Sequence, residues 1–344
     1  MSENQELAEG QIIVGAKNTC GCDSGGVATP GIKGRVGADD YAIDPSEWDK
    51  DPIAVCDTLY SVGGVYGNLE AMKTVREMVA AEEGEVCVVY NGDYHWFDGT
   101  AENFQEVERL LEGYIPMNGN VEFELAREQE CGVGCGCSYP TSMSDAFVGR
   151  SNAIFGRMKE SVSKVPGLAN VVAGRPGWGI VQVGDVFVGL THGDEKSVSG
   201  WGCSVDSIHD AQRVAELDEF FANHKVDVLS TTHTCAAAAI ATEHGAVINN
   251  GSAGLPEYKG MLFGLVNRIS KTPHPDALYR TMVKGIYVEA VPVRYDHDTF
   301  ISWFDSVWDA DSPAAESYRP RAIAGPDTVY SDAVLDGFEI LKEG

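Results

Sequence analysis

Four side chains that can bind a metal ion follow four separate apolar runs of this chain. Asp93 follows VCVVYNG and Asn120 follows a shorter run, while His192 and His233 stand in FVGLTHGD and VDVLSTTHTC. Carboxylate oxygen, amide oxygen and imidazole nitrogen are all ligands of divalent metals. In an open α/β sheet, the loops at the carboxyl ends of the strands carry the site. We therefore expect these four residues to converge on one cation.

Taken singly, each of these residues has an ordinary structural explanation. Asp93 could cap a turn, and His192 could be a buried, hydrogen-bonded histidine. The repetition of the same arrangement at four strand ends favours a shared metal site over four unrelated loops.

The segments between these residues alternate between strand and helix patterns. A helix is predicted to begin after Asn68, which is a suitable N-cap, and to stop at Gly84. Further helices are expected over 102–112, 122–130, 144–165 and 205–221, and strands over 53–62, 86–90, 114–117 and 226–229, with a hairpin over 179–192. The alternation predicts βαβ units and a mostly parallel central sheet.

The composition excludes several classes of partner. The 344 residues include 25 basic and 52 acidic side chains, for a net charge of −27. Such a surface repels nucleic-acid backbones and anionic membranes, but it suits divalent cations, high solubility or a salty cytoplasm. There is no apolar run long enough to cross a bilayer, and the start, MSENQELAEG, lacks the features of a signal peptide. We expect a cytoplasmic protein without nucleic-acid polymer or membrane partners; the sequence does not indicate its oligomeric state.

The nine cysteines are expected to be free thiols or metal ligands before disulfides. Cys131, Cys135 and Cys137 stand in a Gly-rich loop, and Cys20 and Cys22 lie near the start of the chain. Five thiols are enough for a Zn(Cys)4 or an iron–sulfur site, and glycine between thiols lets the sulfurs converge. Neither spacing is the Cys-x2-Cys typical of zinc, so free thiols that cap a loop are an equal alternative.

The distance of this cysteine loop from the four expected ligands depends on the segment between them. If residues 121–130 are helical, Cys131 lies about 15 Å of helical rise from Asn120. The loop is then expected to form a second site or a lid, separate from the ligands of the first cation.

Taken together, the motifs resemble the calcineurin-like metallophosphoesterase superfamily, over about residues 53–295. That family's pattern is Asp-x-His-Gly-Asn, Gly-Asp, Gly-Asn-His/Asp, His and Gly-His-x-His, with an Asn-x-Gly-Ser turn in the compact bacterial branch. The resemblance implies an α/β fold, a four-layer αββα sandwich with mixed sheets, and phosphoester hydrolysis at a two-metal centre. It suggests a metallophosphoesterase-like domain at 51–298 with the Cys-rich loop at 131–137. The composition on either side indicates a Gly/Asp-rich extension at 1–50 and an acidic C-terminal helix and tail at 299–344.

Carried over by position, the resemblance places Asp93 on the carboxylate that bridges both metals in the family. Asn120, His192 and His233 fall on the remaining ligands of one metal, so that set is complete. Asn249, in INNGSAGLP, matches the asparagine of the closing turn and is expected in the pocket.

The second metal's ligands depart from the family pattern. Gly64 stands where aspartate is expected, Tyr66 where histidine is expected, and Cys235 in place of the final histidine. A second ion could persist on Asp93, Cys235 and the Tyr66 phenolate, with preference shifted toward zinc or iron. Tyr66 could equally pack against the pocket, and His95 would reach the site if its loop folds back.

Two functions follow as hypotheses. The first is hydrolysis of a phosphomonoester or phosphodiester of a small metabolite or nucleotide, by water activated on Mn, Fe or Zn held by the four ligands. The alternative is a metal-binding pseudo-phosphatase in which the cysteine loop holds zinc or an iron–sulfur cluster. A purely structural scaffold, with no bound metal, is a third.

Overall fold

The computed structural model describes residues 33–128 and 131–342 of the chain. The sequence also predicts a short strand at residues 11–15, and this segment lies outside the described residues, as do Cys20 and Cys22.

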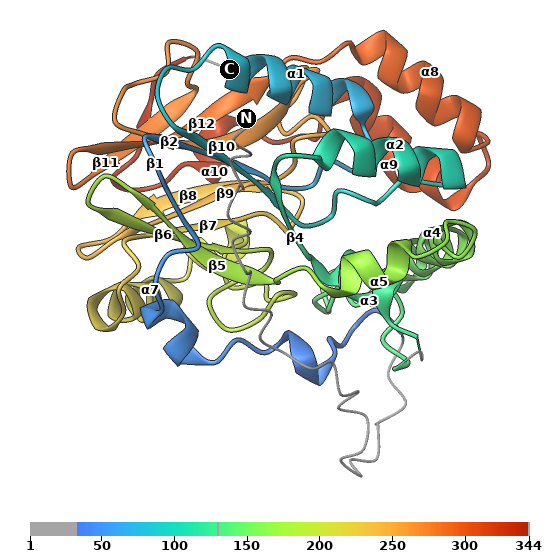
Figure 1. Cartoon of the computed structure of the whole chain (residues 1–344), viewed down its shortest axis with the longest axis horizontal. Helices are drawn as coiled ribbons and strands as arrows, with labels where there is room; N and C mark the ends of the chain where they lie inside the picture. Colours follow the sequence, from blue (N-terminus) through green and yellow to red (C-terminus); the bar gives the residue numbers. More distant parts are fainter. Residues whose placement is uncertain (1–32, 129–130, 343–344) are drawn as a thin grey trace, which may run out of the picture.

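Two mixed β-sheets face each other at the centre of the protein (Figure 1). The six-stranded sheet has the order β1 (Ala54–Cys56), β5 (Trp178–Val183), β6 (Val186–Thr191), β7 (Val228–Thr231), β9 (Ala246–Asn250), β8 (Ala237–Ala241). The seven-stranded sheet has the order β13 (Glu339–Ile340), β11 (Tyr279–Val283), β12 (Ile286–Val293), β10 (Gly264–Ser270), β2 (Thr58–Val62), β3 (Val86–Asn91), β4 (Ile115–Met117).

Helices cover the outer face of each sheet (Figure 1). The seven-stranded sheet packs against α1 (Leu69–Ala80), α2 (Ala101–Leu111), α4 (Asp145–Val162), α8 (His297–Val307) and α9 (Pro313–Ala324), and the six-stranded sheet against α6 (Val205–Ile208) and α7 (Ala211–Asn223). The remaining helices are η1 (Asp39–Tyr41), η2 (Pro45–Asp49), α3 (Asn120–Ala126), α5 (Leu168–Ala173) and α10 (Tyr330–Ala333). The expected four-layer αββα sandwich is confirmed.

The strand sequences explain the layering. Successive side chains of a strand point to opposite faces of the sheet. Leu59 and Val89 are buried between the two sheets, whereas their neighbours Tyr60 and Val88 are buried against the helices. Since both faces are covered, the central strands are apolar on both sides, which produces the continuous apolar runs in the sequence.

Several expected elements are confirmed and others differ. Asn68 caps α1, its side chain accepting from the Ala71 N–H, and the β5–β6 hairpin turns at 184–185. The mostly parallel sheet was wrong: β2, β3 and β4 run parallel, but β10, β11, β12 and β13 add antiparallel pairs. Where an extended acidic tail was expected, α9, α10 and β13 pack on the domain. No helix in the described part of the chain combines the length and apolar character that crossing a bilayer requires.

Candidate metal centre

The four predicted ligands lie together where the two sheets meet. Asp93 follows β3 and Asn120 begins α3 just after β4, so the seven-stranded sheet supplies two of them. His192 follows β6 and His233 follows β7, which are parallel neighbours in the six-stranded sheet. Each sheet therefore contributes two ligands from the carboxyl ends of adjacent parallel strands.

One side chain joins the two sheets at this point. The Asn91 amide, at the end of β3, donates to the carbonyl oxygens of Thr191 (2.8 Å) and Ser230 (3.2 Å), at the ends of β6 and β7. The Asn91 carbonyl also lies 2.9 Å from Nδ1 of His192. These bonds fix the spacing of the strand ends that carry the site.

Each of the four residues leaves one buried ligand atom without a hydrogen bond. These atoms are Oδ1 of Asp93, Oδ1 of Asn120, Nε2 of His192 and Nδ1 of His233. Nε2 of His192 lies 3.2 Å from Oδ1 of Asp93, and the two imidazole rings lie 5.0 Å apart. A buried polar atom without a partner costs about 1–3 kcal/mol, so four such atoms at neighbouring strand ends fit a bound cation.

The opposite ends of three of the four ligands are held in place. Nδ1–H of His192 donates to the Asn91 carbonyl, Nε2–H of His233 donates to the Cys137 carbonyl at 3.0 Å, and the Asn120 amide donates to the Cys135 carbonyl at 2.8 Å. A carbonyl oxygen can only accept a hydrogen bond, so the nitrogen that bonds to it must carry the proton. The other nitrogen of each neutral ring, and the amide oxygen of Asn120, then keep a lone pair for a metal. Burial, with His192 nearby, lowers the pKa of His233 to about 3, which keeps it neutral and able to ligate.

The backbone around the site is strained. Tyr66, Asp93, His233 and Cys235 all have positive φ angles, of 57°, 51°, 22° and 53°. Non-glycine residues in this region cost of order 1–3 kcal/mol each and cluster at functional sites. Before Asp93, Gly92 has φ +83°, and a Cβ on it would lie 2.5 Å from Nδ1 of His192. Glycine is therefore required there for the two sheets to approach.

Glu122 is a site residue that the sequence analysis treated only as a helix former. It is fully buried and accepts from the backbone N–H groups of Asp93 (2.8 Å), His95 (3.2 Å) and Gly119 (3.0 Å). Burial, reinforced by Asp93, raises its pKa. The available signal was a capping-box pattern, since Glu122 is the third residue after the N-cap Gly119 of α3.

Part of the cysteine loop lies closer to the site than expected, because the segment after Asn120 is not helical as far as residue 130. Helix α3 ends at Ala126, and the chain then returns so that Sγ of Cys137 lies 3.3 Å from Nδ2 of Asn120. Cys131 lines a different hollow. Among residues 33–128 and 131–342, no group of three candidate ligands within 4.8 Å of one another includes a cysteine. The described thiols therefore do not support a cluster site by themselves.

The residues expected to hold a second ion do not fit one. The Tyr66 hydroxyl and Sγ of Cys235 lie 2.8 Å apart and bond to each other. Burial, with Cys235 and Asp93 nearby, raises the pKa of Tyr66, and burial raises the pKa of Cys235 to about 11, so both stay protonated. A Cβ on Gly64 would lie 3.0 Å from the Tyr66 ring, so an aspartate there would compete with the tyrosine for space.

Two residues predicted for the pocket lie outside it. His95 is buried with Nδ1 2.5 Å from Oδ2 of Asp98 and Nε2 2.9 Å from Oε1 of Glu108. The Asn249 amide donates to the Cys203 carbonyl and the Thr234 hydroxyl, and its Oδ1 accepts from an N–H. Both side chains have their polar atoms engaged, so they support the surrounding loops.

A cavity of about 270 Å³ is lined by two of the four ligands, Asp93 and His233. Cys137, Cys235 and Tyr66 also line it. The rest of the wall consists of Trp96, Tyr139, Met143, Phe147, Trp201, Thr234, Ala236, Ser317, Tyr318 and Arg321. The helices α4 and α9 therefore contribute walls that the local sequence around the ligands does not reveal.

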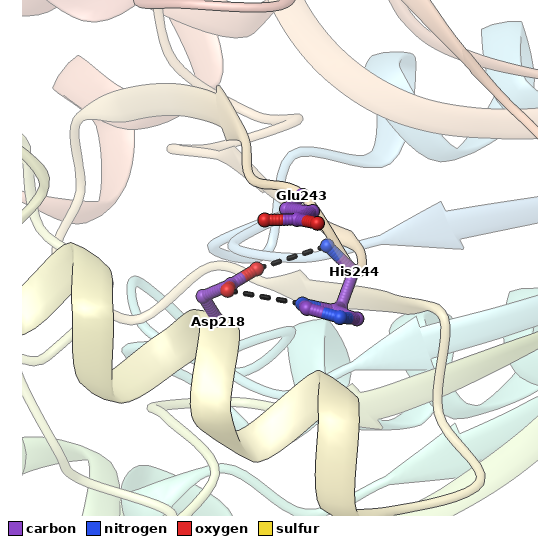
Figure 2. Close-up of side chains that lie close together, drawn as sticks. All are labelled: Asp218, Glu243 and His244. Carbon is purple, nitrogen blue, oxygen red and sulfur yellow. Dashed lines mark hydrogen bonds and ion pairs between the residues drawn. The ribbon is translucent and has the colours of Figure 1, made fainter.

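A second group of ligand types lies on the surface (Figure 2). Among the described residues, only Asp218, Glu243 and His244 place three His, Cys, Asp or Glu ligand atoms within 4.8 Å of one another. Asp218 accepts from the backbone N–H of His244 (2.9 Å) and bonds to Nδ1 of its ring (3.0 Å), so this group ties the β8–β9 turn to α7. The ligand atoms of Asp93, His192 and His233 do not all lie within 4.8 Å of one another. Their arrangement is therefore more open than a closed coordination sphere.

Comparison with known proteins supports the fold. No family model and no curated protein matches the sequence. Among solved structures, a metallophosphoesterase from Sphaerobacter thermophilus matches with a TM-score of 0.50 and 15% identity over 79% of this chain and 100% of that one. A hypothetical protein from Pyrococcus horikoshii OT3 matches with a TM-score of 0.53 and 12% identity over 80% of this chain and 100% of that one. The two facing mixed sheets, with helices outside both, give this chain the calcineurin-like metallophosphoesterase fold.

Proposed function

We propose that this protein is a metal-dependent phosphoester hydrolase that works with one divalent cation, Mn, Fe or Zn. The observation that carries the proposal is the set of four buried, unbonded ligand atoms on Asp93, Asn120, His192 and His233. A carboxylate, an amide oxygen and two imidazoles suit these metals. The metallophosphoesterase fold is a reason, by analogy, to choose phosphoester hydrolysis among metal-assisted reactions.

A bound divalent cation would lower the pKa of a water molecule and polarise a phosphoryl oxygen. The chain's own residues would position the ester in the cavity beside it. Tyr66, whose hydroxyl stays protonated, lines the cavity and can donate to a phosphoryl or leaving oxygen. Arg321 lines the same cavity, held by its ion pair with Glu257 and by its bonds to the Cys235 carbonyl (2.5 Å) and the Pro256 carbonyl (2.9 Å).

The finer proposal concerns the size of the substrate. A cavity of about 270 Å³ admits a small phosphorylated metabolite or nucleotide. A net charge of −27 disfavours a nucleic-acid polymer, whose phosphates the surface would repel. The substrate is therefore a small molecule bearing phosphate.

The test is hydrolysis after metal removal and return. Protein stripped with a chelator should release nitrophenol from mono- and bis-nitrophenyl phosphate only after Mn, Fe or Zn is added. Asp93→Asn should lose at least about 100-fold in kcat/KM, since removal of a metal ligand or its support costs 10–100-fold or more. His244→Ala, at the surface group, should keep full activity. An absence of turnover with all three metals across a broad phosphate panel would remove the proposal, and tight metal binding without turnover would favour the pseudo-phosphatase.

A further inference from the structure

The cavity wall is dominated by aromatic side chains. Six of its residues are tyrosine, tryptophan or phenylalanine: Tyr66, Trp96, Tyr139, Phe147, Trp201 and Tyr318. Their rings are inclined to one another, at 50° for Tyr139 and Trp201 and 56° for Phe147 and Tyr318. None of these neighbouring pairs is stacked face to face, and the side chains of Trp201 and Phe147 are partly exposed, so part of their ring surface is open to a flat ligand.

The aromatic wall begins at the proposed cation and runs to the mouth of the cavity. The Trp201 ring lies 5.3 Å from the His233 ring, and its Nε1–H donates to the Cys137 carbonyl at 3.0 Å, which fixes its orientation. Trp201, Phe147 and Met143 are partly exposed, unlike the buried Trp96 and Tyr139. The organic part of an ester whose phosphate lies near His233 would therefore extend past Trp201 toward Phe147 and Met143.

Charge in the cavity limits the number of phosphates. Of the described residues that line it, Arg321 is the only Lys or Arg, and Asp93 is the only acid. Arg321 is already paired with Glu257 and donates to the Cys235 and Pro256 carbonyls. The described part of this wall offers no second Lys or Arg to neutralise a second phosphate, and the protein as a whole is strongly acidic.

We propose that the substrate carries a single phosphoryl group on a flat, uncharged aromatic group, which stacks against Trp201 and contacts Phe147. This inference rests on the proposed function, because it assumes that the phosphoryl group lies beside the four ligands. It adds the chemical class of the organic part, which those ligands do not determine.

Binding can be measured without catalysis, through tryptophan fluorescence of the Mn-loaded protein. Naphthylmethylphosphonate should quench the fluorescence and bind about ten-fold or more tightly than cyclohexylmethylphosphonate, because stacking on an aromatic side chain is worth about 1–3 kcal/mol. Trp201→Leu should remove this preference, and Phe147→Leu, a second variant at the partly exposed mouth, should reduce it. Trp178→Leu, whose side chain donates to Glu47 away from the cavity, should leave it unchanged.

Turnover supplies the second measurement. Naphthylmethyl phosphate and cyclohexylmethyl phosphate release alcohols of similar acidity, so the ratio of their kcat/KM values reports recognition rather than leaving-group chemistry. The aromatic ester should be preferred about ten-fold or more, by the same stacking contribution, and naphthylmethyl diphosphate should bind more weakly than the monophosphate.

Different outcomes would overturn this inference and the proposed function on which it rests. Hydrolysis of both esters at equal kcat/KM, or tighter binding of the diphosphate, would overturn the aromatic monophosphate class and leave phosphoester hydrolysis standing. Hydrolysis of neither ester, nor of any phosphate in the broad panel, would overturn the proposed function itself.

Discussion

His192 and His233 show how single residues prepare a metal site. Each ring uses one nitrogen to bond a backbone carbonyl, of Asn91 and Cys137 respectively. The other nitrogen stays buried, with Asp93 as the neighbour of His192 Nε2 at 3.2 Å and no hydrogen bond to His233 Nδ1. The sequence could indicate the ligand types, because an imidazole that follows an apolar strand is recognisable. It could not indicate which backbone carbonyls orient the two rings, because every residue has a carbonyl. Only the folded chain brings that of Cys137 to His233.

Tyr66 and Cys235 are the residues at which motif comparison was least informative. Their positions suggested weak ligands of a second ion, and their side chains bond to each other instead. Both residues have positive φ angles. Tyr66 lies between β2 and α1, whereas Cys235 follows β7, so the two residues are far apart in sequence. A pairing of this kind has no local sequence signal.

Glu122 gives the first prediction, at the residue scale. Glu122→Gln replaces an acceptor of three backbone N–H groups with a side chain that also carries donors, so the Asp93 loop should loosen. Metal affinity should fall about 10–100-fold, as for other residues that support a ligand. The measurement is calorimetric titration with Mn²⁺.

The matched control for this prediction lies on the same helix. Glu124 is also nearly buried, but it bonds Tyr41 (2.7 Å) and Arg127 (2.9 Å). Glu124→Gln should reduce the melting temperature without a comparable loss of Mn²⁺ affinity. Equal losses of affinity in both variants would show that Glu122 has no specific role at the site.

At the scale of elements, β3, β6 and β7 were predicted well. The single strand expected over 53–62 divides into β1 and β2 of different sheets, and the helix expected over 205–221 divides into α6 and α7. The runs that became β3, β6 and β7 are apolar on both faces, and their ends correctly located Asp93, His192 and His233. The segment after Asn120 has good helix formers, but α3 stops at Ala126. Where a helix ends, its last carbonyl groups have no partners within the helix. Tertiary contacts satisfy some of them here, among them three hydrogen bonds from Nζ of Lys159 to the carbonyls of Glu124, Leu125 and Arg127.

Helix α2 carries a buried charge network that makes stability depend on pH. Glu108 bonds His95 at 2.9 Å and Arg175 at 2.5 Å. Burial opposes ionisation of Glu108, but His95 and Arg175 outweigh it and lower the pKa from 4.5 to about 2. A carboxyl whose pKa is depressed on folding stabilises the fold above its unfolded pKa, and this contribution is lost as the pH falls from 4.5 toward 2.

The second prediction follows from this sign. Glu108→Gln should destabilise the protein at neutral pH by roughly 3 kcal/mol, at about 1.4 kcal/mol per pKa unit. The difference in the free energy of unfolding between the variant and the wild type should shrink as the pH approaches 2. Urea unfolding at several pH values measures it, with Glu106→Gln as the control, because Glu106 pairs with Arg109 on the exposed side of the same helix. A difference that is constant with pH would contradict the network.

At the scale of the whole molecule, the αββα sandwich followed from the sequence through its motifs more than through its strand pattern. Alternating strands and helices suggested a mostly parallel sheet, since local periodicity does not encode strand direction. The antiparallel strands β10, β11 and β12 contribute no predicted ligand, so the motifs were silent about them. The cavity wall was also beyond the sequence, because Phe147 and Tyr318 come from α4 and α9.

The third prediction concerns the net charge of −27. Repulsion among acidic surface groups destabilises the compact state, and salt screens it. The melting temperature should rise by several degrees between about 0.05 and 1 M salt, where the Debye length falls below about 10 Å. Sodium chloride and choline chloride should act alike, since screening does not depend on the cation. A melting temperature that is flat or falls with salt would show that repulsion is not a major cost.

The most direct test of the metal centre is a count of bound ions. Protein incubated with Mn²⁺, freed of excess by gel filtration and assayed by mass spectrometry for metal, should hold one ion per chain. Asp93→Ala and His192→Ala should each lose that ion, while His244→Ala at the surface group should keep it. An ion that survives Asp93→Ala, or a wild-type chain that binds none, would contradict the convergence of these side chains on a single cation.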